Sequence, residues 1–101
     1  MSRIINHAYY TGENEAPLKF AFEMQTCGLQ AAVQAEEGCL EYDYYAALDG
    51  SEKVILVEGW KDAECLERHM NGEVMQKIRD LKAKYGLETK LEIYKDCRID
   101  S

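Results

Sequence analysis

A chain of 101 residues is long enough for one folded domain and no more, so we expect residues 1–101 to form a single domain. Hydrophobic residues make up 47% of the chain, a share that excludes an intrinsically disordered protein. The formal net charge of -7 disfavours nucleic acid and anionic membranes as partners, because both are bound through clustered Lys and Arg side chains.

Targeting signals and cysteine motifs are not visible. No segment approaches the ~20 apolar residues of a membrane-spanning helix, and polar residues interrupt the N-terminal segment too early for a signal peptide. We therefore expect a cytoplasmic protein that does not bind membranes. The four cysteines, Cys27, Cys39, Cys65 and Cys97, are widely and irregularly spaced, which favours buried, reduced thiols over a zinc site or a redox pair.

The first part of the chain predicts a strand followed by a long helix. Residues 3–10 alternate as a strand does, with Ile5, His7 and Tyr9 on one face and Ile4, Asn6, Ala8 and Tyr10 on the other. Asn14 is the expected N-cap of a helix that continues to about Glu36, with Pro17 in its first turn. Its predicted apolar stripe contains Leu18, Phe20, Phe22, Met24, Cys27, Leu29, Ala31 and Val33. Gly28 inside this helix suggests that a neighbouring element approaches closely.

The middle of the chain predicts a hairpin. Gly38 is the residue expected to end the long helix, and residues 39–48 form the second strand, which is rich in tyrosine. Asp49 and Gly50 predict a tight turn into a third strand over residues 53–60.

The last part predicts two helices and a strand. Asp62 is the expected cap of a short helix over Ala63–Met70, and Gly86 is expected to end a helix over Glu73–Tyr85. The basic residues of that helix, Lys77, Arg79, Lys82 and Lys84, are assigned to its solvent-facing side. Residues 87–95 form the final strand, with Thr89, Leu91 and Ile93 on one face.

This order of elements predicts an α+β fold, the ferredoxin-like split βαβ arrangement. Right-handed crossovers place both groups of helices on one face of a four-stranded antiparallel sheet. The third strand is apolar on both sides, with Val54 and Leu56 on one and Ile55 and Val57 on the other. A strand that is apolar on both sides needs a second cover. We therefore predict a homodimer in which two sheets pack face to face.

Three residues near the end of the third strand are candidates for chemistry. The unperturbed pKa of imidazole, about 6.5, makes His69 a candidate general base or acid. The alternative is a partly buried histidine bonded to the backbone. Trp60 either seals the sheet edge or offers its indole N–H to a substrate oxygen. Glu58 lies on the same face as Trp60 and must be paired, hydrated or catalytic.

Asn6 and the tyrosines complete the candidate set. Asn6 interrupts an apolar strand, so it faces either solvent or a pocket, where its amide would orient a carbonyl or dioxygen. Tyr42, Tyr44 and Tyr45 offer surface either to an aromatic ligand or to a dimer partner. A metal site would need more ligands than His69 and His7, and no phosphate-binding or nucleophile-elbow motif occurs. We therefore expect chemistry without a cofactor.

Two segments resemble the antibiotic biosynthesis monooxygenase (ABM) superfamily, in particular its quinol monooxygenase-like members. The first is A-E-E-G-C-L-E-Y at residues 35–42, and the second is E-G-W-K-D at residues 58–62, followed by Leu66 and His69 in L-E-R-H. The resemblance covers about residues 31–94. Many members carry a second His and a Phe after this histidine, and residues 71–75 of this chain contain neither.

The resemblance implies a dimeric α+β barrel with a small hydrophobic cavity in each subunit. Some members oxidise quinols or polycyclic phenols with dioxygen and use no metal or flavin. It thereby implies a small aromatic or quinone-like substrate, with His69, Trp60 and Asn6 as catalytic residues and Tyr42 and Glu58 as substrate-binding residues. Haem-degrading relatives carry a histidine on the last helix, and residues 76–82 contain none.

Two other functions stay open at this point. A proton-transfer enzyme, such as an isomerase of a small carbonyl compound, would use the same histidine. A dimeric ligand-binding or stress-response module would use the same pocket without catalysis.

Overall fold

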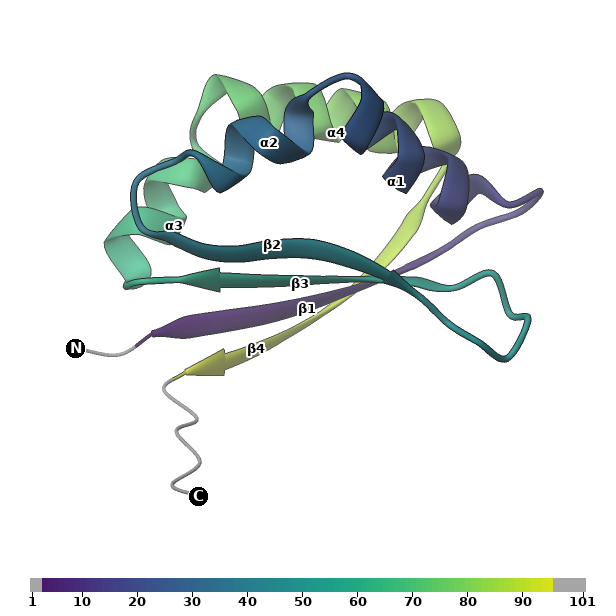
Figure 1. Cartoon of the computed structure of the whole chain (residues 1–101), viewed down its shortest axis with the longest axis horizontal. Coiled ribbons are helices and arrows are strands. Elements are labelled where there is room, and N and C mark those ends of the chain that lie inside the picture. The colour runs from purple at the N-terminus through teal and green to yellow at the C-terminus, as the bar shows by residue number, and fades with distance from the viewer. Residues whose placement is uncertain (1–2, 96–101) are drawn as a thin grey trace.

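The structure is a computed structural model that describes residues 3–95. In chain order the elements are β1 (Ile4–Thr11), α1 (Ala16–Thr26), α2 (Leu29–Gln34), β2 (Cys39–Ala46), β3 (Val54–Trp60), α3 (Ala63–Met70), α4 (Glu73–Tyr85) and β4 (Glu88–Lys95). The helices form one layer over one face of the sheet, and the opposite face carries no helix (Figure 1). Cys97, one of the four predicted reduced thiols, lies outside the described residues.

The sheet has the strand order β2-β3-β1-β4, and every neighbouring pair is antiparallel. This confirms the predicted ferredoxin-like fold with helices on one face. The register puts Tyr42 beside Glu58, Glu58 beside Asn6, and Asn6 beside Ile93. Because side chains directly opposite one another share a face, these four form a single row across the sheet beneath the helices.

The predicted long helix is two helices, because the chain breaks at Gly28. Gly28 has φ 85°, a left-handed conformation that glycine adopts without steric cost, and it precedes the first residue of α2. The expected close approach of a neighbour was wrong, since an added Cβ at Gly28 would meet nothing within 4 Å. The predicted cap is also shifted, because Glu15 and not Asn14 precedes α1, with no side-chain capping bond.

Part of the predicted apolar stripe lies away from the core. Phe20, Met24 and Val33 are fully buried, as expected. Phe22 is 63% exposed, and Cys27 and Ala31 are also exposed. Phe22 lies two positions from both Phe20 and Met24, so it points to the other side of α1 from these buried residues.

The turn between α2 and β2 lies close to α3. Gly38 has φ 82°, and a Cβ added there would collide with the Sγ atom of Cys65. The side chain of Asp62 accepts a hydrogen bond from the backbone N–H of Cys65 at 2.9 Å and caps α3, as predicted. The start of α3 therefore rests directly on this turn, which brings the end of α2 close to His69.

Candidate functional site

A cleft of about 180 Å³ lies between the helix-covered face of the sheet and helices α3 and α4. The residues that line it are Asn6, Ala8, Tyr10, Tyr42, Leu56, Glu58, Leu66, His69, Met70, Met75, Ile78, Lys82, Thr89, Leu91 and Ile93. Leu91 and Ile93 of β4 remain 50% and 55% exposed, so the cleft opens toward solvent along this edge strand. It brings together four of the five predicted site residues.

His69 lies in the last turn of α3 with 3% of its surface exposed. Its Nδ1 atom is 2.8 Å from Oε1 of Glu36, whose side chain is 25% exposed. A carboxylate only accepts hydrogen bonds, so in the neutral imidazole the shared proton lies on Nδ1 and Nε2 keeps its lone pair. Glu36 thus gives His69 the tautomer required of a general base.

The sequence interpretation missed Glu36. The residue follows α2 and is 33 positions from His69 in the chain, so no local spacing links the two. Glu36 and His69 also line a second hollow on the outer surface, beside Glu37 and Arg68. His69 therefore lies between the cleft and this outer hollow, and Glu36 connects it to solvent.

Trp60 packs against His69 but does not itself line the cleft. Its indole is fully buried and stacks on His69, with ring centroids 4.7 Å apart and planes inclined by 27°. The indole N–H donates to Oε1 of Glu58 at 2.7 Å. The sequence analysis considered this N–H as a donor to a substrate oxygen. In the structure it donates to Glu58 instead, and so satisfies one oxygen of this buried carboxylate.

Asn6 faces the cleft and not solvent. It is 3% exposed, and its Oδ1 atom is buried without a hydrogen-bond partner among the described residues. A buried polar atom without a hydrogen-bond partner lowers the stability of the folded state by about 1–3 kcal/mol. At a cleft, such an oxygen is available to accept a hydrogen bond from a bound ligand. Asn6 lies beside Glu58 in the register of β1 and β3, so the free amide oxygen belongs to the same polar row.

Of the three predicted tyrosines, only Tyr42 lines the cleft. Its ring is 2% exposed and lies edge-on to His69, with the ring centroids 6.0 Å apart. Burial raises the pKa of Tyr42 well above its ordinary value, which keeps the phenol neutral and able to donate a hydrogen bond. Tyr44 packs edge-on to Tyr42 and Phe20 in the core, and Tyr45 is 51% exposed.

Lys82 was assigned to the solvent-facing side of α4, and that assignment was wrong. The side chain is half-buried and lines the cleft, with Nζ 5.5 Å from the centre of the Tyr10 ring. Burial lowers the pKa of Lys82, and the charge of Glu58 opposes this effect. Met75, Ile78 and Lys82 follow one another at helical spacing, and this pattern was the available signal for a cleft-facing lysine.

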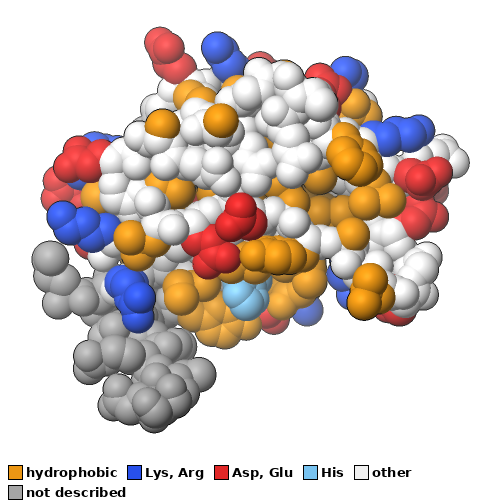
Figure 2. Space-filling model, in the orientation of Figure 1, with side chains coloured by type: hydrophobic (Ala, Val, Ile, Leu, Met, Phe, Trp, Pro, Cys, Tyr) orange, Lys and Arg blue, Asp and Glu red, His pale blue; other side chains and the backbone are white. Residues whose placement is uncertain are grey.

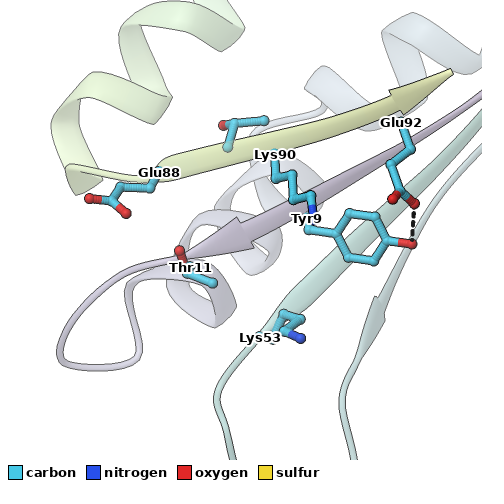
Figure 3. A pocket seen from close by; sticks show the side chains of 7 residues that line it. Tyr9, Thr11, Lys53, Glu88, Lys90 and Glu92 are labelled. Atoms are coloured by element: carbon cyan, nitrogen blue, oxygen red, sulfur yellow. Dashed lines mark hydrogen bonds between the residues drawn. The ribbon is translucent and has the colours of Figure 1, made fainter.

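A larger hollow of about 390 Å³ lies on the helix-free face of the sheet (Figure 3). Side chains of both charges surround it, including Lys53, Lys90 and Glu88. The hydroxyl of Tyr9 donates to Oε1 of Glu92 at 3.0 Å across this surface. None of the predicted site residues lines this hollow, although it shares Thr89 with the cleft beneath α3 and α4.

Within residues 3–95, no group of three or more His, Cys, Asp or Glu side chains is placed to hold a metal ion. The imidazole of His7 lies on the opposite face of the sheet from His69, beside the ring of Tyr94. Among the described residues, no helix has the length and apolar character needed to span a membrane.

Comparison with known proteins gives one family and several related structures. The family model for antibiotic biosynthesis monooxygenase matches residues 5–81. No curated protein matches the sequence. The similar solved structures include a Bacteroides thetaiotaomicron protein of unknown function, provisionally described as an oxidoreductase, with a TM-score of 0.81, 22% identity and coverage of 93% of this chain and 97% of that one.

Two further structures show the same fold. A Deinococcus radiodurans protein, whose assignment as an antibiotic biosynthesis monooxygenase is provisional, has a TM-score of 0.80 and 16% identity, covering 97% of this chain and 96% of that one. A conserved protein of Methanosarcina mazei Go1 has a TM-score of 0.77 and 29% identity, covering 93% of this chain and 92% of that one.

Proposed function

Because this chain belongs to the antibiotic biosynthesis monooxygenase family, we propose that it oxidises a small phenol or quinol with dioxygen in the cleft beneath α3 and α4. The observation that carries this proposal is the His69–Glu36 pair, which leaves Nε2 of a buried imidazole available as a base beside an apolar cleft. Electron-rich phenols react with dioxygen once they are ionised, so a positioned base is the main requirement. No metal or flavin takes part in the proposed reaction.

The proposed reaction balances with dioxygen as the only co-substrate. Nε2 of His69 takes the phenol proton, and the phenolate gives one electron to dioxygen, forming superoxide and a phenoxyl radical. The two radicals join at a ring carbon ortho or para to the oxygen, which forms a C–O bond. His69 returns its proton to the terminal peroxide oxygen and then takes the hydrogen on that ring carbon as a proton. The electrons of the C–H bond form the new C=O bond as the O–O bond breaks. The departing hydroxide takes this second proton from His69, so the products are a quinone and water.

The other site residues take supporting roles in this proposal. Tyr42 offers a neutral phenol that donates to the substrate oxygen as its negative charge develops, and Oδ1 of Asn6 accepts a hydrogen bond from a substrate hydroxyl. Glu58, already bonded to Trp60, accepts a hydrogen bond from a neighbouring substrate hydroxyl. Trp60 acts through its stacking on His69, and apolar side chains such as Leu56 and Met75 exclude water from the ring.

The proposal includes a homodimer formed through the helix-free face of the sheet. Ile5, Ile55 and Val57 lie on this face, and hydrophobic side chains gather around a histidine on the lower side of the molecule (Figure 2). Burial of apolar surface is the main driving force for association, and a stable interface needs about 1,200 Å² or more in total. A second copy would cover this face without closing the cleft from the helix side.

Oxygen consumption by the purified protein tests the function. Reduced naphthoquinone and substituted hydroquinones are supplied, and uptake is recorded with and without catalase, because spontaneous oxidation releases peroxide and the enzymatic route releases water. His69→Ala is expected to slow uptake by a factor of about 10²–10⁴, the usual contribution of a general base. Unchanged uptake in His69→Ala would remove the histidine from the mechanism. Ligand binding without any uptake would favour a non-catalytic module.

A further inference from the structure

Lys82 places a positive charge at the end of the cleft opposite His69. From this arrangement, and resting on the function proposed above, we infer that the substrate is a single-ring hydroxylated aromatic acid. Its hydroxyl would face Nε2 of His69, and its carboxylate would pair with the ammonium of Lys82. This assigns Lys82 as a substrate-binding and specificity-determining residue.

The two polar ends of the cleft are separated by an apolar middle. His69 lies edge-on to Tyr42, which shares a row across the sheet with Asn6, whereas Lys82 lies over the ring of Tyr10. On the floor, Asn6 and Tyr10 lie at opposite ends of a stretch of β1 about 13 Å long. Ala8, Leu56 and Ile78 line the space between these ends. A benzene ring with a hydroxyl and a carboxylate on opposite sides matches this pattern of polar, apolar and polar groups.

The charge of Lys82 has no direct partner in the described part of the chain. Within residues 3–95 no carboxylate forms an ion pair with its ammonium, whereas Lys84 on the same helix is paired with Glu23 at 3.0 Å. Glu58, the only carboxylate among the described residues that line the cleft, accepts the indole N–H of Trp60. The Tyr10 ring holds the ammonium by a cation–π contact, which positions it without neutralising its charge.

The volume of the cleft limits the size of the ring system. A cavity of about 150 Å³ accommodates benzene, and this cleft holds about 180 Å³. One aromatic ring with small substituents therefore fits inside. A fused polycyclic substrate would have to extend past Leu91 and Ile93 into solvent, away from both polar ends.

Calorimetric binding without turnover tests this inference separately from the reaction. The probes are 4-hydroxybenzoate and its uncharged methyl ester, measured at neutral pH and low salt under anaerobic conditions. The wild-type protein is expected to bind the acid at least tenfold more tightly than the ester. Lys82→Met should abolish this preference while Lys82→Arg retains it. The matched control is Lys77→Met, which removes the same charge from an exposed position on the same helix and should keep the preference.

Equal binding of acid and ester by the wild type, or no binding of either at millimolar concentration, would overturn the inference even if Lys82→Met did not fold. A preference that survives in a folded Lys82→Met protein would also overturn it. A preference for the acid that depends on Lys82, in a protein that consumes no oxygen with any phenol, would support the ligand class and sink the monooxygenase proposal. Oxygen consumption by a protein that shows no preference for the acid would support the monooxygenase proposal and overturn the inferred ligand class.

Discussion

The imidazole of His69 lies against the indole of Trp60, with the ring centroids 4.7 Å apart, while its Nδ1 atom meets the carboxylate of Glu36 at 2.8 Å. One contact holds the face of the ring and the other holds its edge. The two partners come from different elements, since Trp60 ends β3 and Glu36 follows α2. The orientation of His69 is therefore a property of the packed domain and not of helix α3 alone.

Glu36→Gln is expected to lower the rate of oxygen consumption by tenfold or more and to change KM little. The amide can donate to Nδ1, which allows the tautomer with the proton on Nε2 and so removes the base. Steady-state kinetics over a range of substrate concentrations measure this. Glu37→Gln is the control, because Glu37 is the neighbouring acid and, within residues 3–95, pairs with the exposed Arg68. Equal rates for Glu36→Gln and Glu37→Gln would contradict the assigned role.

Trp60→Phe is expected to destabilise the protein by about 2–4 kcal/mol, because it leaves a cavity and removes the hydrogen bond to the buried Glu58. Urea denaturation provides the free energy of unfolding. A double-mutant cycle with Glu58→Leu, which removes both acceptor oxygens, should give a coupling energy of about 1 kcal/mol or more. Strictly additive effects of the two substitutions would show that the hydrogen bond contributes nothing.

Gly38→Ala is expected to destabilise the protein more than Gly50→Ala. Both glycines have left-handed backbone conformations, with φ 82° and 79°, so alanine carries a similar backbone penalty of about 1–2 kcal/mol at each. Only at Gly38 would the new Cβ collide with Cys65, whereas nothing lies within 4 Å at Gly50. The additional cost should be about 1–3 kcal/mol. Equal unfolding free energies for the two variants would refute the close contact between this turn and α3.

Glu23→Gln is expected to destabilise the protein at neutral pH but not in acid. The hydroxyl of Tyr85 and the ammonium of Lys84 donate hydrogen bonds to Glu23 and hold its pKa below the ordinary value of 4.5. A lowered pKa in the folded state gives stability that is present above the unfolded pKa and lost as the pH falls through the folded pKa. Urea titrations from pH 7 down to about pH 3 should show the two proteins converging below pH 4.5. Glu67→Gln, an exposed acid on α3, should show no such convergence.

Val57→Lys is expected to convert the proposed dimer to a monomer. Val57 lies on the helix-free face, and a lysine there would bring two like charges into an apolar interface. Sedimentation equilibrium of the wild type and the variant measures the mass. Leu48→Lys is the control, because Leu48 is fully exposed in the hairpin turn, away from that face. A wild-type protein that sediments as a monomer would rule out the proposed dimer.

Much of the fold was accessible from local patterns. Alternation in residues 3–10 predicted both faces of β1, Asp62 predicted the start of α3, and Gly86 predicted the end of α4; the structure confirms all three. The break at Gly28 was not predicted. A glycine inside a helical pattern either continues the helix or adopts a positive φ, and the choice depends on how the flanking segments pack.

The chain alone determined which side chains share a face: Asn6 with Ala8 and Tyr10 on one strand, Glu58 with Trp60 on another, and His69 near the end of a short helix. These follow from periodicity, because burial alternates with the local geometry of each element. Only the tertiary structure decided that Glu36 meets His69, that the N–H of Trp60 is used by Glu58, and that Lys82 turns into the cleft. Such contacts depend on strand register and helix packing, which join residues far apart in the chain and leave no mark in local spacing.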